Sequence, residues 1–309
     1  MNKKVNNYMK KVLLIGALLL TLGACSAPNK EPEHEHEYEV IVEDGWKTCL
    51  AGKAFNSDGL KVYEKCKTCG DVKEVNYSLE NATNLEMGQT SITIKVGDTE
   101  INYPITVKEK YHIACVGDSL TAGHMWAHQS YPTYLSSDVS EDYEVLNCGE
   151  NGISITGYGG NSIKYIERTV YQNSINFAPD IFAIMLGTND ATGWANAEAT
   201  FVEDYHYLID SYIELFPNAR FIMMIAPPTT TPNQFSIPND VIRDSVNPIQ
   251  RELAEEYEME VIDLREEFEA TENYEQLYLR PNGDGVHFTV EAAQYVAGRV
   301  WETAKDLRF

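Results

Sequence analysis

Apolar and polar residues alternate with a period of two in short runs between residues 40 and 108. Short runs such as Gly59–Tyr63 are separated by turn residues, as in half-buried strands. The runs Ser91–Val96 and Ile101–Val107 flank a Gly-Asp turn and predict a β-hairpin. We therefore expect a small all-β module over residues 40–108.

From Tyr111 onward, short apolar runs are followed by longer amphipathic stretches. The strand candidates are His112–Val116, Tyr143–Leu146, Ile181–Leu186, Arg220–Ile225 and Met259–Ile262. The helix candidates are Ala197–Phe216, Asp240–Tyr257 and Val290–Lys305. Five strands alternating with helices predict an α/β domain over residues 110–309, with helices on both faces of a five-stranded parallel sheet. Function in such folds gathers in loops at the carboxyl ends of the strands.

Residues 1–24 form a segment of a different kind. Four lysines precede Val12–Gly23, an apolar run of roughly half the length that a membrane-spanning helix needs. The segment therefore predicts a signal peptide. It ends in the sequence LGAC, which resembles the lipobox of bacterial lipoproteins, and this resemblance implies a lipid on Cys25. We expect a protein tethered to the outer face of the cell membrane. A simple secretory peptide with an incidental cysteine is the alternative.

Residues 25–39 are polar and acidic, which predicts a flexible linker. Its His34 and His36 could bind a metal, although such a short tract is more often only solvated. The chain has 24 basic and 47 acidic side chains, and removal of the first 24 residues takes away four lysines, which leaves a formal charge near −27. This charge repels nucleic acid and excludes it as a partner.

Two stretches of the β module, residues 51–75 and 88–107, resemble a bacterial immunoglobulin-like domain, and the resemblance implies a spacer or an adhesion module. Cys66 and Cys69 have the spacing of a zinc knuckle. Cys49 or an upstream histidine could complete a zinc site. Outside the cell a disulfide is the favoured fate of these cysteines, and unpaired thiols are a third alternative.

Ser119 follows the first strand of the α/β domain, after Gly117 and Asp118. A serine in this place lies at the sheet edge, where the start of a helix favours negative charge on an activated hydroxyl. Asp284 and His287 precede the last helix. A histidine can accept the proton of a serine, and a carboxylate fixes the tautomer of that histidine. Three residues of spacing let the aspartate curl back to one ring nitrogen while the other ring nitrogen faces the serine.

Two further loops could supply hydrogen-bond donors to an oxyanion. The loop Asn147–Gly152 follows the second strand and makes the backbone amide of Gly152 accessible. The loop Leu186–Asp190 follows the third strand and projects the side-chain amide of Asn189. Taken separately, a serine after a strand and a glycine-rich turn are more often a helix cap and an ordinary loop.

Together these segments resemble the SGNH (GDSL) hydrolase superfamily, from residue 111 to the end of the chain. The serine, glycine, asparagine and histidine blocks of that superfamily correspond to Ser119, Gly152, Asn189 and His287, with Asp284 completing a triad. The resemblance implies a flavodoxin-like three-layer fold and two-step acyl transfer through an acyl-enzyme. It implies no cofactor and no catalytic metal.

The superfamily contains carbohydrate acetylesterases, lipases, lysophospholipases and thioesterases, so the fold does not select a substrate. The motifs GDSLTAG and PDIFAIMLGTND, with Ser130-Tyr131-Pro132 soon after the first, are similar to those of carbohydrate O-acetylesterase-like members. The sequence near these blocks has no long apolar run that would form a fatty-acyl tunnel. We expect removal of O-acetyl groups from carbohydrate. A lipase or lysophospholipase at the membrane surface, and a catalytically silent glycan-binding protein, are the alternatives.

Other residues carry weaker expectations. Trp126 and Trp194 follow the serine and asparagine blocks and either line the mouth of the site or pack half-buried. The histidines without a motif partner are interpreted as structural: His124, His128 and His206. Two cysteines at neighbouring strands are expected to be small buried residues, with a disulfide between them left open: Cys115 and Cys148.

Overall fold

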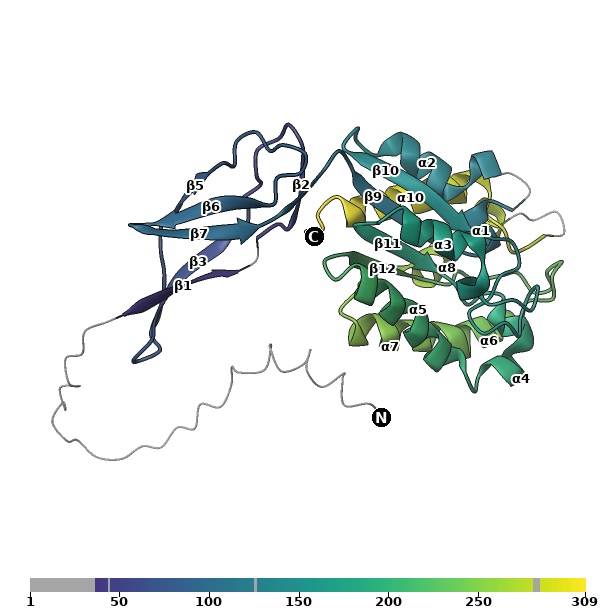
Figure 1. Cartoon of the computed structure of the whole chain (residues 1–309). Helices are drawn as coiled ribbons and strands as arrows, with labels where there is room; N and C mark the ends of the chain where they lie inside the picture. The colour runs from purple at the N-terminus through teal and green to yellow at the C-terminus, as the bar shows by residue number, and fades with distance from the viewer. Residues whose placement is uncertain (1–36, 44, 125–126, 280–283) are drawn as a thin grey trace, which may run out of the picture.

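The computed structural model describes residues 37–43, 45–124, 127–279 and 284–309 (Figure 1). The segment with the predicted signal peptide and Cys25, most of the linker with His34 and His36, and Trp126 lie outside the described residues. Within these ranges, no helix has the length and apolar character needed to cross a membrane. The signal peptide, the lipid and the tether stay predictions.

The first part of the described chain is all-β, as its alternating pattern predicted (Figure 1). Three small sheets make it up: β1 (Tyr38–Glu43), β3 (Lys61–Cys66) and β4 (Val72–Glu74); β5 (Ser78–Glu80), β6 (Ser91–Val96) and β7 (Thr99–Pro104); and β2 (Thr48–Leu50) with β8 (Thr106–Lys108). They enclose a separate core that includes Val62, Leu85 and Ile94. No comparison tests the immunoglobulin-like resemblance, which stays a prediction.

The predicted hairpin is confirmed, since β6 and β7 pair antiparallel and Ile94 lies opposite Ile101. Its second strand is shorter than expected and ends at Pro104. A proline has no N–H to continue the ladder. The chain beyond it forms β8, which pairs in parallel with β2 instead.

The cysteines of this module do not come together as one set of metal ligands. Cys49 lies on the buried strand β2, whereas Cys66 and Cys69 bracket the turn after β3, with the Cys69 N–H 3.5 Å from Cys66 Sγ. All three are present as thiols. Among the described residues, the sole group of three or more ligands close enough to hold a metal lies elsewhere. The favoured disulfide is therefore not seen, and a zinc site completed by an upstream histidine stays untested.

The second part of the chain is the expected three-layer α/β domain. Its parallel sheet has the order β10-β9-β11-β12-β13 and consists of β9 (Tyr111–Gly117), β10 (Tyr143–Gly149), β11 (Ile181–Met185), β12 (Arg220–Ile225) and β13 (Glu260–Asp263). Every residue of β11 is buried. Strands covered on both faces show such continuous apolar runs, which explains why the sequence located the inner strands β9, β11 and β12; the edge strands β10 and β13 are more exposed.

Helices cover both faces of this sheet (Figure 1). One core lies between the sheet and α3 (Thr169–Asn176), α5 (Phe201–Leu215) and α7 (Asn247–Glu256). The other core lies between the sheet and α2 (Tyr131–Asp138), α8 (Leu264–Glu269) and α10 (Val290–Ala304). Shorter helical segments are α1 (Ser119–Ala122), α4 (Trp194–Ala197), α6 (Asn239–Val241), α9 (Tyr274–Leu277), a π-turn at Ile242–Val246 and 3-10 turns at Ala127–Gln129, Tyr165–Glu167 and Asp190–Gly193.

Two of the predicted helices are interrupted. The stretch predicted at 197–216 forms α5 from Phe201 onward, with its first residue Ala197 ending α4, and the stretch predicted at 240–257 divides into α6, the π-turn and α7. Pro248 lies in the first turn of α7. Because it has no N–H for a helical hydrogen bond, the backbone before it departs from regular α-helix.

The strand register excludes the disulfide between Cys115 and Cys148. Cys115 lies opposite Asn147 in the β9–β10 pair, so the two cysteines are one residue out of step. Successive side chains of a strand point to opposite faces. Cys115 and Cys148 accordingly belong to different cores on opposite faces of the sheet, where both are buried thiols.

The β module meets the amino-terminal edge of the sheet through an aromatic cluster. Trp46 packs against Tyr111 and Phe309, with ring centroids 6.2 and 5.6 Å apart. The backbone N–H groups of Lys47 and Thr48 donate to Phe309 O, at 3.0 and 2.8 Å. These contacts join the two parts of the chain at the edge opposite to Ser119.

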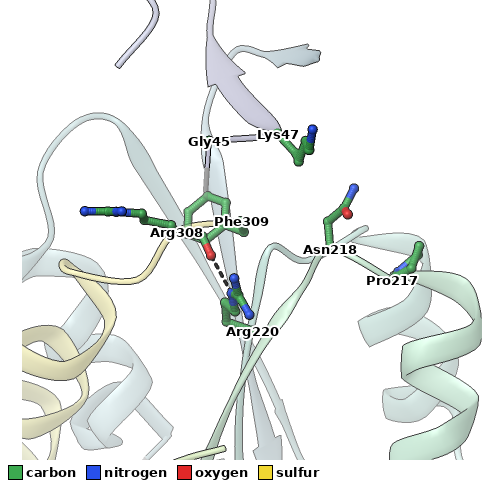
Figure 2. Close-up of a pocket in the computed structure, with 7 residues that line it drawn as sticks. All are labelled: Gly45, Lys47, Pro217, Asn218, Arg220, Arg308 and Phe309. Atoms are coloured by element: carbon green, nitrogen blue, oxygen red, sulfur yellow. Dashed lines mark hydrogen bonds between the residues drawn. The ribbon is translucent and has the colours of Figure 1, made fainter. Parts of the chain in front are cut away.

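A cavity of about 290 Å³ lies in this junction, lined by Gly45, Lys47, Pro217, Asn218, Arg220, Arg308 and Phe309 (Figure 2). Each of its cationic side chains already has a structural contact. Lys47 Nζ lies 3.6 Å above the ring of Tyr103, and Arg220 Nε donates to Arg308 O. Arg308 packs over Gly59, where a Cβ would collide with its guanidinium. The cavity is therefore a gap in the packing between the β module and the α/β domain.

Candidate active site

Ser119 stands just beyond the carboxyl end of β9, which lies between β10 and β11 in the sheet, as the sequence predicted. Asp118 caps α1 through a bond of 2.9 Å from Leu120 N to its Oδ1, and this cap turns the chain sharply out of the sheet. Gly117 permits the turn, because a Cβ there would lie 2.0 Å from Thr121 Oγ1 and 2.8 Å from Met185 O. The Ser119 side chain is held at a position where only 8% of the residue is exposed.

The structure brings Asp284 and His287 to this serine. His287 Nε2 lies 2.8 Å from Ser119 Oγ, and His287 Nδ1 lies 3.0 Å from both carboxylate oxygens of Asp284. Asp284 Oδ1 also accepts the backbone N–H groups of Val286 and His287, so the segment curls back on itself. Gly285 makes this possible with φ +66°. The local arrangement that the spacing predicted is present.

The ionised state of Asp284 suits its contact with His287, the histidine that would accept a proton from Ser119. Partial burial raises the pKa of Asp284, but the hydrogen bonds from the His287 ring and backbone outweigh it and lower the pKa to about 2. The carboxylate is therefore ionised at neutral pH. An ionised carboxylate at Nδ1 holds the ring N–H there and leaves Nε2 free to accept from the serine hydroxyl.

The sheet order places the two predicted oxyanion loops on either side of Ser119, because β9 lies between β10 and β11. Asn189 Nδ2 donates to Ile153 O at 2.8 Å, which fixes the amide and leaves its second N–H for another acceptor. Gly152 adopts φ +71°, and its carbonyl accepts from Asn161 N at 2.7 Å. One expectation needs correction: β10 continues to Gly149, so the predicted loop at 147–152 is limited to residues 150–152.

Asp190 anchors this side of the site, which the sequence did not indicate. Its carboxylate accepts from Ile155 N at 3.0 Å, from Thr156 N at 2.9 Å and from Thr156 Oγ1 at 2.7 Å. These bonds attach the loop after β10 to Asp190, the residue next to Asn189. The relevant signal was the position of Asp190 directly beside the predicted donor in the GTND motif.

Asp118 is the second buried acid beside the serine. Burial raises its pKa to about 7, against the bond from Leu120 N and together with the negative charge of Asp190. Its Oδ2 is buried and has no hydrogen-bond partner among the described residues. The acid thus holds its proton far more tightly than an exposed aspartate.

His124 was interpreted as a structural residue with no motif partner, and the structure places its side chain against the predicted base. Its ring stacks on the ring of His287, with centroids 3.9 Å apart and an angle of 4° between the planes. Phe235 lies edge-on to both rings. Neither contact follows from a sequence motif, because a turn and a distant loop create them.

The same region holds the sole metal-ligand group found among the described residues. Ligand atoms of His124, Asp284 and His287 lie within 4.8 Å of one another. Both ring nitrogens of His287 are already engaged, by Asp284 and by Ser119. The two rings are also parallel, so their lone pairs lie in separate planes and do not converge on one point. An ion here would compete with the hydrogen bonds of His287.

The remaining candidates lie away from the serine. Trp194 packs against Phe201 at 5.2 Å and joins the core, which favours the half-buried alternative for this residue. His206 Nδ1 lies 2.6 Å from Tyr257 Oη, in agreement with a structural role. His128 lies exposed in the 3-10 turn before α2.

A small hollow lies beside the serine, lined by Ser119, Leu120, Gly123, Gln129, Ser130, Tyr131, His287, Phe288 and Ala293. The hollow has a volume of about 10 Å³. That volume accommodates roughly one water-sized group.

The fold and these side chains define a three-layer α/β domain with a serine, a histidine and an aspartate in hydrogen-bond contact. The sequence model of the GDSL-like lipase/acylhydrolase family matches residues 115–295, well over half of the chain, and the protein belongs to this family. The match covers the segments of all five predicted site residues.

Known proteins agree with this family. An acetylxylan esterase from Xylanibacter ruminicola is 26% identical over 182 residues, which are 52% of this chain and 37% of the relative. The chain thus spans little more than a third of the length of that relative. Two solved structures share the fold: a lipase/acylhydrolase from Enterococcus faecalis (21% identity, TM-score 0.50, 63% of this chain and 95% of that one) and a carbohydrate acetylesterase from Sinorhizobium meliloti (14%, 0.51, 63% and 99%).

Proposed function

We propose that the protein is a serine esterase that removes O-acetyl groups from carbohydrate outside the cell. The observation that carries the proposal is the continuous chain of hydrogen bonds from Asp284 through His287 to Ser119 Oγ. A serine hydroxyl is a weak nucleophile, and a histidine oriented by an ionised carboxylate is the arrangement that activates it.

The reaction proceeds in two steps. Ser119 Oγ attacks the carbonyl carbon of the ester while His287 Nε2 accepts the hydroxyl proton. As the bond between the carbonyl carbon and the alcohol oxygen breaks, His287 returns this proton to the alcohol oxygen and an acyl-serine remains. Water then attacks the acyl carbon and gives its proton to His287, and Ser119 regains a proton as the carboxylic acid leaves. Asp284 stays ionised throughout and stabilises the imidazolium.

The negative oxygen of each tetrahedral intermediate requires hydrogen-bond donors. The second N–H of Asn189 and the backbone N–H groups of Gly152 and Ser119 serve this purpose in our proposal. Support comes from the sheet order, which places the loops after β10 and β11 on either side of Ser119. The bond from Asn189 Nδ2 to Ile153 O holds one of these donors in a fixed orientation before the reaction.

A short acyl group on a sugar is the favoured substrate. The hollow at Ser119 and His287 has room for about one water-sized group, which suits the methyl of an acetyl group. The acetylxylan esterase relative adds support, because its similarity spans 182 residues.

We further propose that the protein works at the outer face of the cell membrane, held by a lipid on Cys25. The support is the lysine-rich and apolar start of the chain, which ends in the LGAC sequence, and the strongly acidic composition of the rest. Such a protein would meet polysaccharides whose sugars carry O-acetyl esters.

Protein without residues 1–24 tests the activity. We expect hydrolysis of p-nitrophenyl acetate well above that of the octanoate ester, release of acetate from acetylated xylan, and loss of both in Ser119→Ala. A preference for octanoate would contradict the acetylesterase and favour a lipase or lysophospholipase. Wild-type protein that hydrolyses no ester of any chain length, with Ser119→Ala indistinguishable from it, would favour a silent glycan-binding protein.

The location needs a separate test in cells. Full-length protein labelled with a fatty acid should partition into the membrane fraction and be accessible to protease added outside. The Cys25→Ala variant should lose the label and the membrane association. A labelled Cys25→Ala protein would contradict the lipid site.

A further inference from the structure

The ring of His287 lies against a second imidazole. His124 follows α1 directly, and its ring is stacked on His287 with 3.9 Å between the centroids and 4° between the planes. His124 is five residues beyond Ser119 in the sequence. One short turn therefore supplies both the nucleophile Ser119 and the ring that stacks on His287, the base.

The backbone forces His124 into this position. Gly123 ends α1 with φ 86°, and His124 follows with φ 46°, so two consecutive residues have left-handed conformations. The N–H groups of both donate to Ser119 O, each at 3.0 Å. Left-handed backbone is unfavourable for a residue with a Cβ, and histidine is among the residues that tolerate it best. Such conformations persist where neighbouring contacts fix them, and they cluster at functional sites.

Phe235 holds the same two rings from the side. Its centroid lies 5.1 Å from His287 and 5.8 Å from His124, and its plane is nearly perpendicular to both. The loop of Phe235 is itself fixed: Asn233 Oδ1 accepts from Phe235 N and Ile237 N, and Gln234 N donates to Asp284 O at 3.0 Å. The imidazole of His287 is therefore bounded on one face and one edge by rings from two separate loops.

We propose that His124 is a positioning residue that fixes the plane of the His287 ring during acyl transfer. This inference rests on the proposed function. Asp284 contacts Nδ1 but leaves the imidazole able to tilt about that contact. Nε2 must point first at Ser119 Oγ and later at the leaving oxygen and at water, and a stacked ring keeps the imidazole in the plane that serves all three.

Two variants of His124 separate stacking from other roles. His124→Ala removes the ring, whereas His124→Phe restores a flat ring without nitrogen atoms. We expect His124→Ala to lower kcat for p-nitrophenyl acetate by about tenfold to a hundredfold with KM within about twofold, because a small misplacement of a catalytic group has effects of this size. His124→Phe should recover kcat to within a few-fold of the wild type. The control is His128→Ala, an exposed histidine four residues away, with unchanged kinetics.

Ring NMR of His287 gives a readout that does not depend on any substrate. The 15N and 1H signals of its imidazole should shift and broaden in His124→Ala and should stay close to those of the wild type in His124→Phe. Signals that are equally sharp in all three proteins would overturn the proposal, whether or not an ester is hydrolysed. Wild-type kcat in His124→Ala would do the same, provided that Ser119→Ala is inactive. Equal loss in both variants together with a raised KM would place His124 in contact with the substrate instead.

Discussion

The two ends of the five-stranded sheet have opposite characters, although the same strands reach both. At the amino ends, the aromatic rings of Trp46, Tyr111 and Phe309 join the β module to the α/β domain. At the carboxyl ends lie the buried polar and charged residues Asp118, Ser119, Thr188, Asn189, Asp190 and His287. Strand β9 connects the two, with Tyr111 at one end and Gly117 at the other.

This difference separates stability from chemistry. Burial of aromatic area stabilises a fold in proportion to the area removed from water. Burial of a polar or charged group costs free energy unless that group is paired. At the carboxyl ends Asp118 Oδ2 and Thr188 Oγ1 are buried without a hydrogen-bond partner among the described residues, so this end carries polar groups that cost stability beside the groups that serve the reaction. Changes at the carboxyl ends should affect turnover, and at Asp118 also stability, whereas changes at the amino ends should affect unfolding without affecting turnover.

Asp284→Asn should give the largest effect on turnover. The amide of asparagine can place its NH₂ group against Nδ1, so Nε2 would carry the ring proton and could not accept another from Ser119. We expect kcat for an acetyl ester to fall by about 10⁴-fold, the loss typical of this change in other triads. The melting temperature should change little, since asparagine keeps the size of the side chain. A rate within tenfold of the wild type would contradict the role of Asp284.

Asp118 should make the carboxyl end sensitive to pH. Its pKa is about 7 in the folded protein, against 3.8 for an ordinary aspartate. Between these values the folded state keeps a proton that the unfolded state has lost, so the free energy of unfolding falls as pH rises from about 4 to about 7, by up to roughly 4 kcal/mol. Asp118→Asn keeps the helix cap but cannot ionise.

Urea unfolding at pH 4.5, 6 and 7.5 measures this effect. The wild type should lose stability across the series relative to Asp118→Asn. Asp98→Asn is the matched control, because Asp98 is exposed in the hairpin turn of the β module, and its pH series should match that of the wild type. Parallel pH series for the wild type and Asp118→Asn would contradict a raised pKa at Asp118.

Asn189→Ala should lower turnover without unfolding the protein. Loss of one oxyanion donor costs about 2.7 to 4 kcal/mol of barrier, so we expect kcat to fall by roughly a hundredfold or more. Asn173→Ala is the control, because Asn173 is an exposed asparagine of α3 with no predicted part in the chemistry. It should leave the rate unchanged. Near wild-type kcat in Asn189→Ala would refute its role as a donor.

The sequence predicted the parts of the site that depend on strand ends. Buried parallel strands appear as continuous apolar runs, so the loops after β9 and β11 could be located, and the positions of Ser119 and Asn189 follow from them. Gly152 follows the edge strand β10, whose burial is only partial, and was found through its glycine-rich loop. Asp284 was predicted to reach His287 because their contact is local, three positions apart in the sequence. The fold class and the family followed from the same blocks.

Residues that depend on special backbone or on distant loops were not predicted. His124 reaches His287 through two left-handed residues, and Phe235 arrives from a loop about 50 residues before the histidine. No periodic pattern carries such information. The short helices α2 and α3 also escaped prediction, because eight residues give few turns over which a periodicity can develop.

Trp46 should show the smallest effect on turnover and a clear effect on stability. It packs against the core of the β module and against one core of the α/β domain, so it belongs to both. Trp46→Ala should lower the free energy of unfolding by about 2 kcal/mol, near the lower end for loss of a large buried side chain because Trp46 is only half-buried. Its indole Nε1 is buried without a hydrogen-bond partner among the described residues. Trp46→Phe, which keeps a ring and removes that donor, should therefore cost less than Trp46→Ala. Both variants should keep kcat within about twofold of the wild type, because the junction lies at the end of the sheet opposite to Ser119. A large loss of kcat in Trp46→Phe would show that the two ends of the sheet are coupled and would contradict the separation of stability from chemistry.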